Sequence, residues 1–172
     1  MPDTQYAYKY LDVDGTPCNG GSGKWAMPKG KRPGAWMPAI TDIVPCQRGY
    51  HLCRVQDLLA WSGPTLWRAE YRGRAIAHED SKLVVEQARL LSLVTTWNER
   101  TQRLFACDCA EHVAHLYTAK HPTGWQPADT IAVVRRYANR QATREEWDAA
   151  RVAAWAAAGA AADAAAWAAT MA

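Results

Sequence analysis

The densest group of reactive side chains in this sequence lies between Cys46 and Cys53. These eight residues read Cys-Gln-Arg-Gly-Tyr-His-Leu-Cys. A thiol beside an imidazole can support nucleophilic catalysis, and thiols together with histidine are also zinc ligands. Nucleophilic catalysis and zinc binding are therefore the first two hypotheses.

The spacing of the cysteines argues against zinc. Structural zinc sites usually hold paired cysteines about two to four residues apart, whereas six residues separate Cys46 from Cys53. The other potential ligands share one predicted helix: Cys107, Cys109, His112 and His115. Their spacing directs them to different sides of that helix. We therefore predict no metal site, and we expect Cys109 to be a small buried side chain.

The sequence also gives little support to nucleophilic catalysis by a cysteine with His51. His51 and Cys53 share a face of an extended segment, but no third group is evident that would orient the imidazole. A packed or hydrogen-bonded histidine at a strand end is the simpler interpretation. We expect both cysteines to pack around a turn at Gly49, and we expect Tyr50 and His51 to line a pocket.

The elements that position this motif form a predicted N-terminal unit over residues 1–95. It is expected to be a mixed, mainly antiparallel β unit with one short helix. Strands are predicted at 6–11, 40–44, 66–72 and 88–94, and the helix at 54–61. The clearest strand alternates, with Trp67, Ala69 and Tyr71 on one face and Arg68, Glu70 and Arg72 on the other.

A long basic loop precedes the motif. Residues 15–38 are rich in Gly and Pro and contain no acidic residue. Its cations are Lys24, Lys29, Lys31 and Arg32. The segment 20–24 reads Gly-Gly-Ser-Gly-Lys, but a phosphate-binding P-loop would need Gly at Cys18 and Ser or Thr at Trp25. The loop is thus expected to be flexible and able to contact a phosphate-bearing ligand through lysines and backbone N–H groups, with Trp25 and Trp36 anchoring its ends.

Residues 96–172 are predicted to form a three-helix bundle. Asn98 is expected to cap a first helix with an apolar stripe over 104–117, and Pro127 opens a second helix. Thr143 and Glu146 form a capping box that begins a long Ala-rich terminal helix. In that helix Trp147, Trp155 and Trp167 are expected to supply the bulky contacts. The complete fold prediction is α+β.

Composition narrows the functional classes. The formal net charge is +3, which is too small to indicate a nucleic-acid-binding protein. Five cysteines form no pairing framework, and the first ten residues lack the pattern of a secretory signal. Arg151 and Asp163 interrupt the Ala-rich tail, so no membrane span is predicted. A reducing cytoplasm is the expected compartment.

Several of these motifs, taken in order, are similar to a known group. Tyr8-Lys9, Cys46, the run from Gly49 to Cys53, the strand ending at Gly73 and the turn before Lys82 resemble a phage-associated domain of unknown function. The resemblance covers residues 6–94. This chain differs by the inserted loop at 26–38 and by Leu52, where an aromatic residue is usual. Residues 97–172 resemble a helical family of phages and actinobacteria described as immunity proteins, most clearly over 103–113.

A looser resemblance concerns the order of strands. An aromatic and basic strand, a Gly-aromatic-His strand and a strand carrying glutamate are similar to the compact ADP-ribosyltransferases. That resemblance implies an NAD pocket in which Lys9, with Tyr50 or His51, holds the dinucleotide and Glu70 is the acid. Lysine is unusual at the first of these positions.

These observations lead to two functional predictions. The first is a phage-encoded accessory or anti-defence protein in the host cytoplasm. It would bind a host or phage macromolecule, a protein above all, through Lys24, Lys29, Lys31, Arg32, Tyr50 and His51, without a cofactor. The second is an ADP-ribosyltransferase-like or nucleotide-binding enzyme with a pocket near Lys9, His51 and Glu70. A structural virion module is less expected because the chain has no repeat or coiled-coil pattern.

Overall fold

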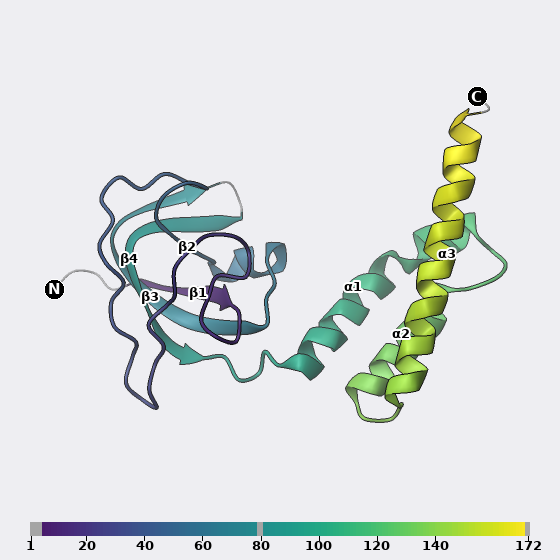
Figure 1. The fold of residues 1–172 in the computed structure, drawn as a ribbon, viewed down its shortest axis with the longest axis horizontal. Helices are drawn as coiled ribbons and strands as arrows, with labels where there is room; N and C mark the ends of the chain where they lie inside the picture. Colours follow the sequence, from purple (N-terminus) through teal and green to yellow (C-terminus); the bar gives the residue numbers. More distant parts are fainter. Residues whose placement is uncertain (1–4, 79–80, 171–172) are drawn as a thin grey trace. The chain divides into compact units, whose positions relative to one another are not determined.

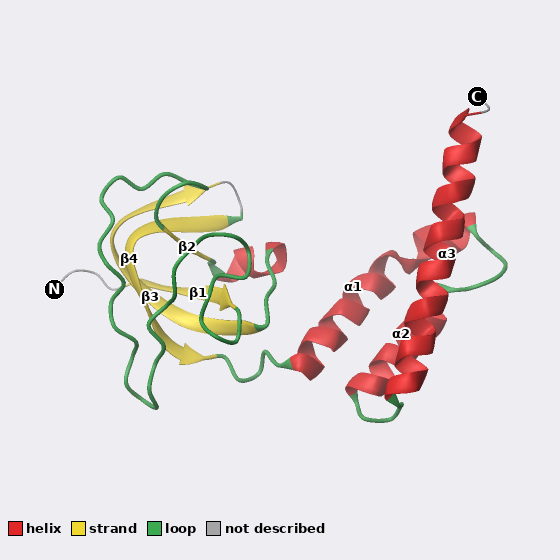
Figure 2. Cartoon of the chain, viewed as in Figure 1, coloured by secondary structure: helices red, strands yellow, loops and turns green. Residues whose placement is uncertain are grey.

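The computed structural model describes residues 5–78 and 81–170, with side chains described as far as residue 161. The fold is α+β, as the sequence predicts. The chain divides into two compact units, Met1–Asn98 and Glu99–Ala172. The first unit contains all the described strands, and the second contains the three α-helices (Figures 1 and 2).

The first unit is built on one four-stranded sheet. Its strands are β1 (Gln5–Leu11), β2 (Tyr50–Leu52), β3 (Thr65–His78) and β4 (Lys82–Leu93). Their order across the sheet is β1-β3-β4-β2, and each described strand pair is antiparallel. A 3₁₀ helix, η1 (Val55–Ala60), follows β2.

The sheet curls until its two edges meet (Figure 2). Tyr8 on the β1 edge exchanges two backbone hydrogen bonds of 2.8 Å with Cys53, which directly follows β2. Beyond β2, the free edge of β4 is covered by loop residues. The backbone N–H groups of Gly34, Met37 and Ile40 donate to β4 carbonyls at 2.9–3.0 Å. The second half of the basic loop is therefore held against the sheet.

The curled sheet encloses the main core. Its largest fully buried side chains include Leu11, Leu52, Leu90 and Val85. Trp25, only 5 % exposed, packs into the same cluster from the basic loop. Burying apolar area contributes roughly 25 cal/mol per Å², so Trp25 is an anchor of the loop, as predicted.

Two strand predictions need correction. Residues 40–44 form no strand; Val44 instead makes an isolated bridge to Arg48 across a tight turn. The two central strands are also longer than predicted, because β3 continues past residue 72 and β4 begins at residue 82. A bulge between Arg72 and Ala75 interrupts their register and lets the long hairpin bend.

The second unit contains α1 (Glu99–Lys120), α2 (Pro127–Ala138) and α3 (Arg144–Thr170). The α2 helix contacts both α1 and α3. The predicted capping box is confirmed: the Glu146 N–H donates to Thr143 Oγ1 at 3.2 Å, and the Thr143 N–H donates to Glu146 Oε2 at 2.7 Å. Trp147 stacks on Tyr137 with ring centroids 5.4 Å apart.

The predicted apolar stripe of α1 is largely exposed. Val113 and Leu116 are 52 % and 59 % exposed. Cys109 is exposed as well, and Cys107 is the buried cysteine of α1, so the prediction for Cys109 was wrong. On α3, Trp155 is 75 % exposed and provides less packing than expected, while the side chain of Trp167 lies outside the described residues. Within the described part of the chain, no helix is long and apolar enough to cross a membrane.

Candidate functional site

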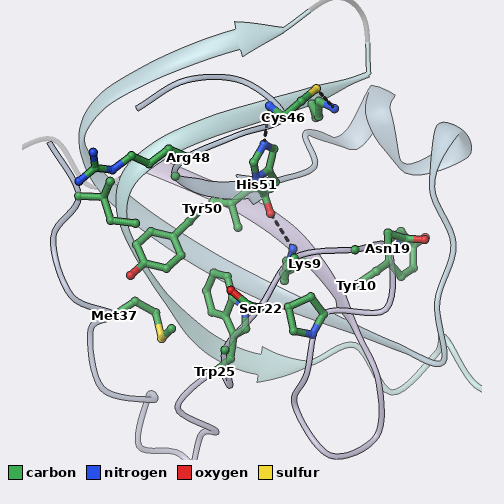
Figure 3. Close-up of a pocket in the computed structure, with 18 of the residues that line it drawn as sticks. Lys9, Tyr10, Asn19, Ser22, Trp25, Met37, Cys46, Arg48, Tyr50 and His51 are labelled. Atoms are coloured by element: carbon green, nitrogen blue, oxygen red, sulfur yellow. Dashed lines mark hydrogen bonds between the residues drawn. The ribbon is translucent and has the colours of Figure 1, made fainter. Parts of the chain in front are cut away.

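A pocket of about 790 Å³ opens in the first unit beside the Cys46–Cys53 motif (Figure 3). Three parts of the chain form its wall: β1 near Lys9, the Gly-rich segment 19–24, and the motif itself from residue 46 to 53. Lys82 at the start of β4, Trp61 after η1 and the loop residues Met37, Pro38 and Ile40 complete it. The curl of the sheet explains this meeting, because the Tyr8 and Cys53 bridge joins β1 to the end of the motif.

The pocket is lined by cations. Lys9, Lys24, Arg48 and Lys82 contribute four positive side chains, and His51 adds an imidazole. None of the described residues that line the pocket is Asp or Glu. Anions are therefore the ligands that this lining attracts.

Lys9 is the most buried of these cations. It lies on the same face of β1 as the core residues Ala7 and Leu11. Its ammonium donates to the carbonyl oxygen of His51 at 3.0 Å and lies 5.6 Å from the ring centre of Trp25. Among the described residues no carboxylate pairs with it, and burial lowers the pKa of the amine. An anion in the pocket would supply the missing counter-charge.

His51 is held as a hydrogen-bond acceptor. The backbone N–H of Cys46 donates to its Nε2 at 3.0 Å (Figure 3), so that nitrogen carries no proton. Burial lowers the pKa of His51, and the charges of Lys9 and Lys82 lower it further. The neutral imidazole is therefore part of the folded structure of this turn.

This arrangement predicts a pH dependence. The folded pKa of His51 lies below its ordinary value of 6.5, so the unfolded chain takes up the proton first as the pH falls. The free energy of unfolding of the first unit should therefore decrease below about pH 6.5 and level off below the folded pKa. Urea unfolding between pH 5 and 8 measures this decrease. A variant His51→Gln should show a smaller decrease, and an identical profile would contradict the assignment.

The two motif cysteines have different environments. Cys53 is 8 % exposed, and burial raises the pKa of its thiol to about 11, so it is a packing residue, as predicted. Cys46 is exposed, which contradicts the packing prediction. It adopts a positive φ of 65°, and its Sγ lies 3.0 Å from Lys82 Nζ.

The Gly-rich segment presents backbone donors to the pocket. Gly20, Gly21 and Gly23 all have positive φ, and residues 20–24 line the pocket wall. No backbone N–H from Gly20 to Lys24 donates to an acceptor among the described residues. Successive N–H groups of this kind can bind an anion even without a P-loop sequence.

Glu70 does not reach this pocket. It pairs with Tyr6 across β1 and β3, which places it on the opposite face of the sheet from Lys9. There it is 6 % exposed and forms an ion pair with Arg89. The expected convergence of Lys9, His51 and Glu70 is therefore absent, because Lys9 lies three positions after Tyr6 along β1 and an odd offset places two strand residues on opposite faces.

The four loop cations do not form one cluster. Lys24 lines the pocket. Lys29 and Arg32 exchange backbone hydrogen bonds of 2.9 and 3.0 Å in a separate exposed turn, which also carries Lys31. Neither this turn nor its side chains are part of the pocket lining.

Sequence reasoning missed Arg48 and Lys82 as pocket residues. Arg48 lies inside the Cys46–Cys53 motif, and its positive charge next to Tyr50 and His51 could have identified it as a pocket residue. Lys82 is 36 residues from Cys46, so only the pairing of β2 with β4 reveals their proximity.

Among the described residues no group of three His, Cys, Asp or Glu side chains could hold a metal ion. Comparisons with known protein families, curated proteins and solved structures found no match.

Proposed function

We propose that the first unit is a binding module for a phosphate-bearing organic anion of nucleotide size. The observation that carries this proposal is the lining of the pocket: four cations and a histidine, with no acidic side chain among the described lining residues. Cationic side chains bind phosphate through charge-assisted hydrogen bonds. Lys9 contributes most, because its charge is buried and lacks a described carboxylate partner.

Size and the remaining lining support an organic ligand over inorganic phosphate. Small-molecule pockets usually measure roughly 300–1,000 Å³, and this one measures about 790 Å³. Tyr50 and Trp61 contribute aromatic surface to its wall, and Met37 adds apolar surface. A nucleotide combines a phosphate for the lysines and loop N–H groups with a flat base for the apolar wall.

Binding is favoured over group transfer. An ADP-ribosyltransferase needs an acid near its substrate, and Glu70 lies on the other face of the sheet. The prediction of nucleotide binding agrees with the cationic lining of the pocket. The prediction of ADP-ribosyl transfer lacks support, because no described residue that lines the pocket is an acid. The resemblance to phage proteins stays a prediction. In that setting the protein would act by capturing a host or phage nucleotide, either free or as part of a larger molecule.

Calorimetric titration tests the proposal. The full chain should bind ADP and pyrophosphate at low ionic strength, and adenosine should bind much more weakly, because the phosphates make the charged contacts. Added salt should weaken ADP binding, since ions screen exposed charges over about 8–10 Å at physiological ionic strength. Equal affinity for adenosine and ADP, or no binding of either phosphate compound at millimolar concentration, would refute it.

A further inference from the structure

Cys46 and Lys82 are brought together from distant parts of the chain. Cys46 belongs to the turn before β2, and Lys82 is the first residue of β4. The distance between Sγ and Nζ is 3.0 Å. The bond from the Cys46 N–H to His51 also fixes the backbone of this turn. Both side chains line the pocket, so the contact is a built part of its wall.

This contact distinguishes Cys46 from the other cysteines. Cys53 and Cys107 are buried and Cys18 is partly buried, and burial raises the pKa of all three thiols. Cys109 is exposed like Cys46, but no cation among the described residues contacts its sulfur. The thiolate is the reactive form of a cysteine side chain.

We propose that Cys46 and Lys82 are the site of an oxidative crosslink, a sulfenamide, formed by hydrogen peroxide at the wall of the pocket. The Cys46 thiolate attacks one peroxide oxygen, and the O–O bond breaks. The sulfur becomes a sulfenic acid, and the hydroxide that leaves takes a proton from Lys82 to give water. The neutral Lys82 amine then attacks the sulfur, and the S–N bond forms as a second water leaves.

The reaction balances without a further reagent. One peroxide is reduced by two electrons to two waters, and the sulfur supplies those electrons. The 3.0 Å separation already places the amine next to the sulfur, so closing the S–N bond needs only a small side-chain movement. A thiol reagent such as dithiothreitol would reverse the crosslink by attacking the Cys46 sulfur.

Crosslinking would also change the pocket, a consequence that rests on the proposed function. A sulfenamide nitrogen is uncharged at neutral pH, so the pocket loses the positive charge of Lys82. The pocket's affinity for ADP should therefore fall on oxidation and recover on reduction. The crosslink itself forms whether or not ADP is the ligand.

Mass spectrometry of the full chain tests the crosslink. Peroxide treatment should lower the intact mass by two hydrogen atoms, and digestion should yield one joined peptide pair containing residues 46 and 82. Dithiothreitol should restore both the mass and the separate peptides. The variant Cys46→Ser should lose the product, whereas Cys109→Ser, which removes an exposed cysteine with no ammonium contact among the described residues, should keep it.

The variant Lys82→Arg keeps a cation beside the sulfur but supplies no lysine amine. In the Lys82→Arg variant, oxidation of Cys46 should stop at sulfenic acid, which dimedone traps. The unsubstituted protein should give at least ten-fold less dimedone adduct. Equal dimedone trapping in both proteins would overturn the proposal. So would a product that retains oxygen, a disulfide at Cys46, or oxidation of Cys109 as fast as Cys46. None of these readouts depends on ADP, so failure of the crosslink and failure of the proposed function can be told apart.

Discussion

Replacing Lys9 with methionine should reduce affinity for ADP at least ten-fold while the first unit stays folded. A hydrogen bond to a charged group contributes about 1.5–3 kcal/mol, and each 1.4 kcal/mol is about ten-fold in affinity. The expected loss is large because Lys9 is the buried cation, whose described contacts are the His51 carbonyl and the Trp25 ring. Calorimetry on the variant measures it.

The matched control is Lys29→Met, which removes one positive charge from the same half of the chain. Lys29 lies in the separate exposed turn and does not line the pocket. Its variant should bind ADP within about two-fold of the unsubstituted protein, because an exposed charge outside the pocket is screened by salt. Methionine fills nearly the volume of the lysine stem, so the first unit should stay folded, with the thermal midpoint lowered only by loss of the hydrogen bond to the His51 carbonyl. Equal ADP affinity in the two variants would contradict the role of Lys9.

Replacing Gly49 with alanine should strongly destabilise the first unit. Gly49 has a φ of +125°, where side chains are rarely accommodated, and an added Cβ would lie 2.6 Å from Val84 Cγ1. Val84 is fully buried and cannot move aside. Backbone strain and overpacking each cost about 1–3 kcal/mol, so the free energy of unfolding should fall by about 2–6 kcal/mol.

Gly23→Ala is the control that separates backbone strain from the steric contact with Val84. Gly23 also has a positive φ, of +91°, but no atom lies within 4 Å of its added Cβ. It should therefore show only the cost of backbone strain. Urea unfolding, followed by hydrogen exchange of β3 and β4 amides, compares the two variants. A Gly49→Ala variant no less stable than Gly23→Ala would show that the turn does not pack as described.

The strands with clear alternation could be predicted from the sequence, and so could the helix caps. Residues 66–72 alternate, and β3 contains them with the predicted faces. The capping box of Thr143 and Glu146 is purely local, and both of its hydrogen bonds form. Residues 40–44 were misread because the segment looks apolar and β-branched, while its place in the fold depends on hydrogen bonds to β4.

The environment of Glu70 and the composition of the pocket could not be predicted in this way. The sequence places Glu70 on the same face as Arg68 and Arg72, which suggests a solvated face. In the structure Trp36, from the basic loop, covers this face: its ring centre lies 4.3 Å from Cζ of Arg72 and 4.6 Å from Cζ of Arg89. Glu70 is buried there and forms an ion pair with Arg89. Burial of a strand face depends on which distant loop covers it, and that information is tertiary.

The central claim is that the pocket beside the Cys46–Cys53 motif binds a phosphate-bearing ligand, and an NMR titration of ¹⁵N-labelled full chain with ADP tests it most directly. Backbone amide signals of Lys9, His51 and residues 20–24 should shift together with one dissociation constant. The amides of residues 29–32 and of α1 to α3 should stay in place. Shifts confined to residues 29–32 or to the helices, or no shift at millimolar ADP, would contradict the account.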